Sequence, residues 1–404
     1  MKRKKPMVNF TLQPLKLINS IYDTTSVFVA RSSPNASRWL PQSAMERDMA
    51  TASMLTVLGD MPIVCAASVS TPEALSLLRD AGFQIPKKIY RYADVKEYMK
   101  ILHKLFNDGL IMVTQHVHPL SEMPPEYCWI APPVLSFVNN KANLGNLVPK
   151  DNVPFREIVS VDQIVNGKRK WIAPVVIKTV TDESTGGGID VRICLSGDDV
   201  KKAASYFADC CFVVCEEWMD IRRNLCLHYS ITNDGIITYL GFTEQVSDNR
   251  GAYCGNWLED GTVCPGDAVE VGASIVRAAY EHGYYGIVGI DMAVWEEQPC
   301  KVFDLNFRAN GSTPAILYSQ SVYRHHQKPV IRLRRLKGSG NYRDMLNSVY
   351  RAMIKGILLP LGSCDPEKGN YVEKHPLLTG MILGETRQDV LENERELASM
   401  GLDI

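Results

Sequence analysis

Short apolar runs alternate with helical patterns along most of this chain, and the alternation restricts the fold to the α/β and α+β classes. Residues 26–30 and 62–66 are predicted strands. Residues 71–82 are a predicted helix, with Thr at the N-cap, Pro at the first helical position and Gly at the end. Because such strand–helix units repeat as far as residue 135, the sequence predicts a small parallel sheet there.

The composition is that of a globular protein. The 404 residues carry 44 basic and 45 acidic side chains, and 46% of them are hydrophobic. At roughly 150 residues per domain this length suits two to three domains. The balanced charge argues against a dedicated nucleic-acid binder. No apolar run approaches the ~18–20 residues of a membrane span, and no apolar core follows the basic residues 1–5. We therefore expect a soluble cytoplasmic protein without membrane or nucleic-acid partners.

The eleven cysteines also fit a reducing compartment. Their number is odd and none forms a C-x-x-C pair, so neither a disulfide scaffold nor a structural zinc site is expected.

From about residue 136 the predicted elements change character. Strands are predicted at 171–178, 189–194, 211–218, 286–291 and 301–306, and helices at 196–208 and 267–282. We expect four parts: an α/β domain (1–135), a small lobe with a Gly-rich loop (136–213), a large lobe (214–330) and a C-terminal helical extension (331–404).

Lys178 lies on a hydrophobic strand that precedes three consecutive glycines, Gly186, Gly187 and Gly188. Such a loop lets backbone N–H groups approach phosphate oxygens, while the lysine supplies a positive charge. It is not a Walker A loop, because no Gly-Lys-Ser/Thr follows the glycines. It is not a dinucleotide fingerprint either, because the flanking elements are predicted as strand–loop–strand. Taken alone, a flexible hairpin without a ligand also explains it.

Three oxygen-bearing side chains are predicted to converge on a second pair of strands. Asp304 and Asn306 have the same parity, so both point to one face. Asp291 ends the preceding predicted strand, at a spacing that suits a hairpin placing it beside Asp304. Such a site suits Mg²⁺ with bound phosphates, although turn residues at a sheet edge are the simpler alternative.

Arg308 and Asn310 continue the parity of Asn306. An arginine beside a metal–phosphate centre stabilises charge that develops during phosphoryl transfer. Pairing with a surface carboxylate is the alternative for Arg308.

Four features, taken together and in their order along the chain, resemble the ATP-grasp superfamily of carboxylate–amine ligases. They are Lys178 with its glycine loop, residues 216–219, Asp291 and the D-x-N-x-R motif at 304–308. The resemblance runs from about residue 136 to 320. It implies an ATP-grasp fold, in which two α+β lobes clamp ATP, preceded by a small parallel-sheet pre-ATP-grasp domain.

The resemblance also implies roles for individual residues. Lys178 and Lys141 would contact ATP, and Gly186 to Gly188 would close over the triphosphate. Four consecutive residues would form a hinge whose backbone reads adenine: Glu216, Glu217, Trp218 and Met219. Many members place a glutamate after this hinge, whereas this chain has residues 222–226, Arg-Arg-Asn-Leu-Cys, which leaves the ribose contact open.

The metal and substrate residues follow from the same resemblance. Asp291 and Asp304 would hold one Mg²⁺, and Asp304 with Asn306 a second, with Mn²⁺ as an alternative ion. Arg308 would bind the acyl phosphate and its transition state. Residues 243–256 look like the family's substrate loop, so four residues are expected near the substrate: Arg250, Gly251, Gly255 and Asn310. A surface turn is the alternative for the loop.

The implied reaction converts the carboxylate of an amino acid or peptide to an acyl phosphate at the expense of ATP, and a nucleophile then attacks it. The chain looks similar to natural-product peptide ligases of antibiotic biosynthesis, with an amine acceptor, and to a butirosin-pathway ligase that loads glutamate onto a carrier-protein thiol. A kinase-like or non-catalytic nucleotide-binding protein is the remaining alternative.

Two C-terminal features bear on partners. The basic stretch 324–337 would steer an acidic carrier protein, or it is a solvated edge strand. Predicted helices at 344–355 and 387–400 would cap the active site or mediate homodimerisation.

Overall fold

The computed structural model describes residues 10–35, 38–165, 172–247 and 253–404, and within these ranges the strands form three sheets. The N-terminal sheet is parallel, with the order β3–β2–β1–β4, which confirms the expected small parallel sheet. Its strands are β1 (Ser26–Val29), β2 (Ile63–Ala66), β3 (Ile89–Tyr92) and β4 (Ile111–Thr114). The helices of this region are α1 (Ala44–Ala52), α2 (Pro72–Asp80) and α3 (Val95–Asn107). The cap of α2 is as predicted, since the Thr71 side chain accepts from the Ala74 N–H.

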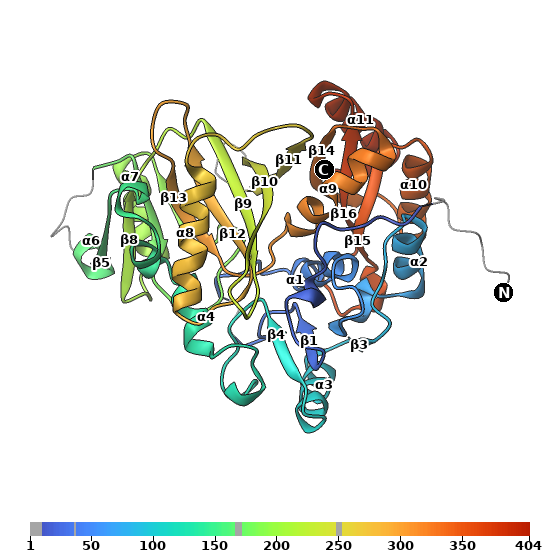
Figure 1. The fold of residues 1–404 in the computed structure, drawn as a ribbon, viewed down its shortest axis with the longest axis horizontal. Coiled ribbons are helices and arrows are strands. Elements are labelled where there is room, and N and C mark those ends of the chain that lie inside the picture. The colour runs from blue at the N-terminus through green and yellow to red at the C-terminus, as the bar shows by residue number, and fades with distance from the viewer. Residues whose placement is uncertain (1–9, 36–37, 166–171, 248–252) are drawn as a thin grey trace.

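A connecting segment then carries two short helices and a 3-10 turn. These are α4 (Pro132–Asn139), the turn at Lys141–Asn143 and α5 (Leu144–Leu147). In Figure 1, α4 lies below α8 and the strands that α8 covers, near β4.

The small sheet forms one end of the molecule (Figure 1). Its order is β5–β8–β6–β7, and every neighbouring pair is antiparallel. The strands are β5 (Arg156–Ser160), β6 (Val175–Thr179), β7 (Val191–Cys194) and β8 (Phe212–Glu217). Helices α6 (Val161–Val165) and α7 (Gly197–Tyr206) accompany them, and the small sheet has its own hydrophobic core. The expected strand–loop–strand around the glycines is therefore confirmed.

The large sheet has nine strands within the described ranges, in the order β13–β12–β9–β10–β11–β14–β16–β15, with β17 beside β14. Its first half comprises β9 (Arg223–Ile231), β10 (Ile237–Ser247), β11 (Tyr253–Glu259), β12 (Gly286–Val294) and β13 (Lys301–Asn306). Helix α8 (Ala268–Glu281) packs on β9 and β10, and α9 (Thr313–His326) leads to the second half.

The C-terminal region is not purely helical, which corrects the expected helical extension. The two predicted helices are present as α10 (Tyr342–Ile354) and α11 (Arg387–Ser399). Between and around them, four strands extend the large sheet: β14 (Val330–Gly338), β15 (Leu358–Cys364), β16 (Leu377–Gly384) and β17 (Leu402–Asp403). Their hydrophobic faces are buried against the two helices, so the apolar runs pair as strands. The four expected domain boundaries stay a prediction.

The basic stretch is also not a solvated edge strand. β14 pairs with β11 on one side and β16 on the other, so it lies inside the sheet. Two of its arginines, Arg332 and Arg334, are largely buried and share the carboxylate of Glu394 on α11, at 3.0 and 3.2 Å. These two side chains therefore hold α11 against the sheet, and they are too buried to form a docking surface.

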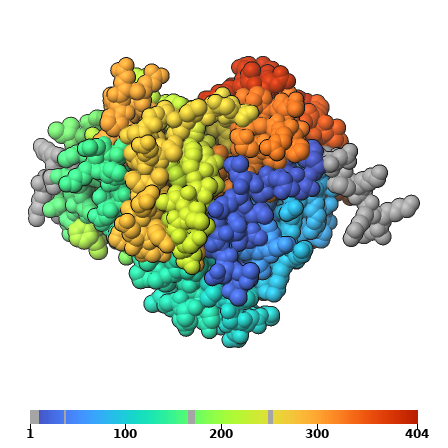
Figure 2. Space-filling view, in the orientation of Figure 1, coloured from blue at the N-terminus to red at the C-terminus, as the bar shows by residue number. Residues whose placement is uncertain are grey.

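The N-terminal and C-terminal regions pack closely together, as the adjoining blue and orange surfaces in Figure 2 show. Across this contact the hydroxyl of Tyr371 donates to Asp48 Oδ2 at 2.7 Å, with both residues buried. No disulfide joins any two of the described cysteines. Among the described residues, no helix is long and apolar enough to cross a membrane, and no cluster of three His, Cys, Asp or Glu side chains is arranged as a metal site.

Candidate active site

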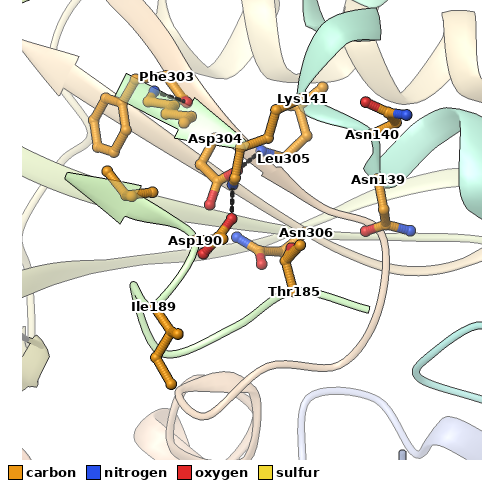
Figure 3. Close-up of polar contacts among 12 residues, drawn as sticks. Asn139, Asn140, Lys141, Thr185, Ile189, Asp190, Phe303, Asp304, Leu305 and Asn306 are labelled. Atoms are coloured by element: carbon orange, nitrogen blue, oxygen red, sulfur yellow. Dashed lines mark hydrogen bonds and ion pairs between the residues drawn. The ribbon is translucent and has the colours of Figure 1, made fainter. Parts of the chain in front are cut away.

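Two buried lysines stand opposite acidic side chains between the small and large sheets. Lys141, on the turn after α4, donates to Asp304 Oδ1 at 2.5 Å and lies 3.3 Å from Asp190 Oδ2 (Figure 3). Although burial opposes it, the charges of Asp190 and Asp304 raise the pKa of Lys141, so the ammonium is retained. The predicted contact residue Lys141 is thus held beside the D-x-N-x-R motif.

Lys178 forms hydrogen bonds with groups on both the small and the large sheet. Its ammonium donates to Glu216 Oε1 on β8 at 2.5 Å and to the carbonyl oxygen of Phe303 on β13 at 2.8 Å. The register between β12 and β13 shifts at Phe303, which forms a bulge between the partners of Asp291 and Met292. A bulge leaves backbone groups outside the ladder, and here the carbonyl of Phe303 receives the lysine. The second predicted lysine therefore points at the same strand as the first.

The two predicted metal-binding carboxylates face each other. Asp291 and Asp304 are register partners on β12 and β13, which confirms the expected hairpin, although Asp291 lies inside its strand and not at its end. Gln245 donates to Asp291 Oδ1 at 2.7 Å, and Asn306 donates to Asp291 Oδ2 at 3.1 Å. The three predicted oxygen-bearing side chains thus meet at one place.

The pKa values of the two carboxyl groups are shifted in opposite directions. Burial, with the charge of Asp304 beside it, raises the pKa of Asp291 to about 7. Burial has the same direction at Asp304, but the ammonium groups of Lys141 and Lys178 outweigh it and lower the pKa of Asp304. The buried Asp291 and the half-buried Asp304 offer carboxylate oxygens, which a hard divalent cation prefers. The side-chain oxygen of Asn306 is bonded to Arg308 in this structure, so the amide would have to turn to join them.

Arg308 organises the loop that follows β13. Its guanidinium donates to Asn306 Oδ1 at 2.7 Å, to Asn139 Oδ1 at 3.0 Å and to the Thr185 carbonyl at 3.2 Å. The first of these bonds turns the amide nitrogen of Asn306 toward Asp291. Arg308 therefore joins the motif, α4 and the start of the glycine loop, and none of these partners neutralises its charge.

The glycine loop rests against the N-terminal region. The N–H of Gly186 donates to the Trp39 carbonyl at 3.0 Å, so this amide is already paired. Gly187 and Gly188 have φ of +69° and +73°, which favours glycine. A Cβ on Gly187 would lie 3.2 Å from Pro41. The roles of the three glycines toward a triphosphate stay predictions.

The first two residues of the predicted hinge point their side chains to different surroundings. The side chain of Glu216 is buried and faces Lys178, whereas that of Glu217 is exposed and accepts from the Phe155 N–H at 2.7 Å. The Glu217 N–H in turn donates to the Phe155 carbonyl at 2.9 Å, so this amide is not free to read a base. Trp218 is 41% exposed and Met219 is half-buried. Adenine contact by the other hinge groups stays a prediction.

Two of the four predicted substrate residues can be placed. Arg250 and Gly251 lie outside the described residues. Gly255 has φ of +114° on β11, and a Cβ there would meet the Leu333 carbonyl. The side-chain oxygen of Asn310 accepts from the N–H groups of Ser312 and Thr313, both at 3.1 Å, at the start of α9. In the structure Gly255 allows two strands to approach closely, and Asn310 binds the start of α9. Their substrate contacts stay predictions.

Sequence reasoning missed several side chains of this cluster. Arg156 on β5 lies 3.7 Å from Glu216 and donates to the Lys141 carbonyl at 2.6 Å. Asp190, directly before β7, and Asn139 on α4 are the partners of Lys141 and Arg308 described above. None belongs to a local motif, and only the pairing of distant strands brings them in.

Two family models match the chain. The model described as "L-aspartate--L-methionine ligase, ATP grasp" matches residues 154–306, and the one described as "L-aspartate--L-methionine ligase N-terminal domain" matches residues 17–136. Together they span about two thirds of the chain.

Solved structures share the fold over nearly the whole length. An N5-carboxyaminoimidazole ribonucleotide synthetase in complex with ADP has a TM-score of 0.61 at 12% identity, with 97% of this chain and 98% of that chain covered. The biotin carboxylase domain of the 2-oxoglutarate carboxylase of Hydrogenobacter thermophilus, with MgADP and bicarbonate, has a TM-score of 0.56 at 12% identity, covering 93% and 89%. An L-amino acid ligase from Bacillus licheniformis has a TM-score of 0.53 at 10% identity, covering 94% and 98%.

Proposed function

The chain belongs to the ATP-grasp superfamily of carboxylate–amine ligases, and we propose that it joins two amino acids at the expense of ATP. In this reaction one amino acid carboxylate becomes an acyl phosphate, the amine of the other attacks it, and ADP and phosphate leave. Because both matching models are described as L-aspartate–L-methionine ligases, aspartate is the proposed carboxylate substrate and methionine the proposed amine.

The observation that carries this proposal is the convergence of Lys141, Lys178 and Arg308 on the paired carboxylates of β12 and β13. Three cations beside one acidic pair form a site for a polyanion bound through a divalent cation. In the proposed complex both lysines compensate phosphate charge, and Arg308 binds the transferring group and the carboxylate it reaches. The hydrogen bonds from Arg308 to Asn139 and Asn306 hold the guanidinium ready for this task.

Asp291, Asp304 and Asn306 would hold Mg²⁺, which neutralises phosphate charge and aligns the reacting oxygens when bound. The remaining contribution of the protein is positioning, since its own side chains are already fixed by buried ion pairs. Such a site requires no covalent enzyme intermediate.

The test measures ADP release with pairs of amino acids, together with hydroxamate formation when hydroxylamine replaces the amine. We expect ADP release that depends on a carboxylate and an acceptor, with aspartate and methionine as the best pair. We expect Asp304→Asn and Arg308→Met to reduce turnover by at least ~10²-fold, whereas Arg343→Met, at an exposed position on α10, leaves it unchanged. Absence of both ADP release and hydroxamate with any amino acid would refute the proposal.

The comparisons support amine ligation and give no support to carrier-protein loading or to a natural-product role. The kinase-like alternative differs in its product, because it leaves a stable phosphorylated compound. Homodimerisation and a cytoplasmic location stay predictions.

A further inference from the structure

The carboxyl ends of β1 and β4 lie directly against the active site. The sheet order reverses between these neighbouring strands, and ligands of open parallel sheets bind where that reversal occurs. After β4, the side chain of Gln115 donates to the Ala309 carbonyl at 2.6 Å, one residue past Arg308. The Val117 carbonyl accepts from Ser184 of the glycine loop at 3.3 Å. The segment 115–117 is therefore clamped between the D-x-N-x-R motif and the glycine loop.

His116, in the middle of this segment, faces a small cavity that it shares with Arg308. The cavity has a volume of about 20 Å³, which is room for one water or one amino group, and Ser184, Thr185 and Asn139 also line it. The imidazole is half-buried and makes no hydrogen bond with any described residue. The imidazole is therefore a nitrogen base without a hydrogen-bond partner among the described residues. It lies in a cleft beside the Arg308 guanidinium, which is proposed to bind the acyl phosphate.

The ring of His116 is held in its uncharged form, so a nitrogen lone pair is present to accept a proton. Burial lowers its pKa well below the ordinary value, and Arg308 and His118 act in the same direction, so the ring is uncharged near neutral pH. Asp182 and Glu183 of the glycine loop line the same cavity.

An apolar groove continues from this cavity toward solvent. Its volume is about 430 Å³, and it shares Val117, Ser136 and Asp182 with the cavity. The rest of its lining is mostly apolar: Pro119, Leu120, Pro132, Pro133 and Phe137, with His118 and Asn143. An apolar amino acid side chain fits this chemistry and volume, with its amino group directed into the small cavity.

We propose that this cavity and groove bind the amine substrate, with His116 as the catalytic residue that accepts the proton from the attacking nitrogen. The inference rests on the proposed function. The C–N bond forms as the C–O bond to phosphate breaks. The electron pair of that C–O bond leaves with phosphate. The nitrogen loses two protons: the imidazole accepts the ammonium proton and releases it to solvent before the attack, and it passes the second proton, lost after the attack, to the departing phosphate. The apolar side chain of the amine substrate lies in the groove.

The test compares His116→Asn with wild type using two nucleophiles. Hydroxylamine is uncharged near neutral pH and needs little help from a base, whereas the ammonium form of an amino acid must lose a proton. We expect kcat for dipeptide formation to fall ~10²-fold or more, while hydroxamate formation and the KM for ATP change by less than about threefold. The exposed His103→Asn serves as the matched control and is expected to behave as wild type.

Equal losses with both nucleophiles would overturn the role of His116, because they indicate disturbed phosphoryl transfer or folding. If wild type forms neither dipeptide nor hydroxamate, the proposed function itself fails. A wild type that forms hydroxamate and dipeptide, with a variant that forms both normally, refutes only this inference.

The groove is tested separately with Leu120→Glu. Leu120 is 64% exposed, so the change is compatible with folding. We expect the KM for an apolar amine substrate to rise about tenfold, because the carboxylate must be desolvated beside the ligand, while hydroxamate formation is unchanged. Leu15→Glu, at a residue 50% exposed elsewhere, is the control. An unchanged KM would place the amine substrate outside this groove.

Discussion

A buried histidine in the large sheet makes the stability of this protein depend on pH. His228 on β9 is fully buried, its Nε2 pairs with the Ser312 hydroxyl at 3.1 Å, and its Nδ1 has no hydrogen-bond partner among the described residues. Burial lowers the pKa of His228 from 6.5 to about 3. The folded state therefore holds a neutral ring, whereas the unfolded chain takes up a proton below pH 6.5.

The sign and size follow from proton linkage. A histidine with a depressed folded pKa stabilises the protein fully above the unfolded pKa, and this contribution is lost as pH falls below it. Between pH 7.5 and pH 5.5 the unfolded state gains about one proton at this site while the folded state gains none. The loss is about 1.4 kcal/mol of unfolding free energy, and any folded pKa below about 4.5 gives nearly the same figure.

The assay is urea unfolding of wild type and His228→Gln at both pH values, followed by circular dichroism. Other groups titrate in both proteins, so the quantity of interest is the difference between the two pH-dependent losses. We expect the loss to be about 1.4 kcal/mol smaller in the variant. The exposed His103→Gln should retain the wild-type loss. Equal losses in wild type and His228→Gln would refute the claim that this ring is neutral in the folded state.

Two further pairs of substitutions test the space beside a glycine and a buried ion pair. Gly255→Ala should destabilise far more than Gly109→Ala, although both positions have positive φ: the first Cβ would lie 2.1 Å from the Leu333 carbonyl oxygen, and the second meets nothing within 4 Å. Similar melting temperatures of the two variants would contradict this reasoning. Glu216→Gln should cost about 3–5 kcal/mol in urea unfolding, because it leaves the Lys178 ammonium buried without its anion. Adding Lys178→Met should recover part of that loss, and purely additive losses in the double variant would count against the pair.

Local patterns predicted the secondary structure around the site well. Strand periodicity located β6, β12 and β13, and the spacing between Asp291 and Asp304 was enough to predict their pairing across a hairpin. The resemblance to ATP-grasp ligases added Lys141, which no periodicity indicates. These successes share a cause, since a strand, a cap or a hairpin depends on residues close together in the chain.

The sequence was less informative about side chains whose exposure and partners depend on contacts between distant parts of the chain. The arginines of β14 suggested a solvated strand or a docking surface, but the strand is internal and two of them pair with Glu394 on a helix about 60 residues later. Asn310 continued the parity of the motif, yet its side-chain oxygen accepts from the N–H groups of Ser312 and Thr313 at the start of α9.

The sequence by itself determined the alternation of strands and helices, the hairpin of acids and the order of the motifs. Only the tertiary structure placed Arg156 beside Glu216, and His116 beside Arg308. These partners are far apart in the chain and belong to no common motif. Their proximity depends on which strands neighbour one another, and that is set by burial of whole sheet faces and not by any short pattern of residues.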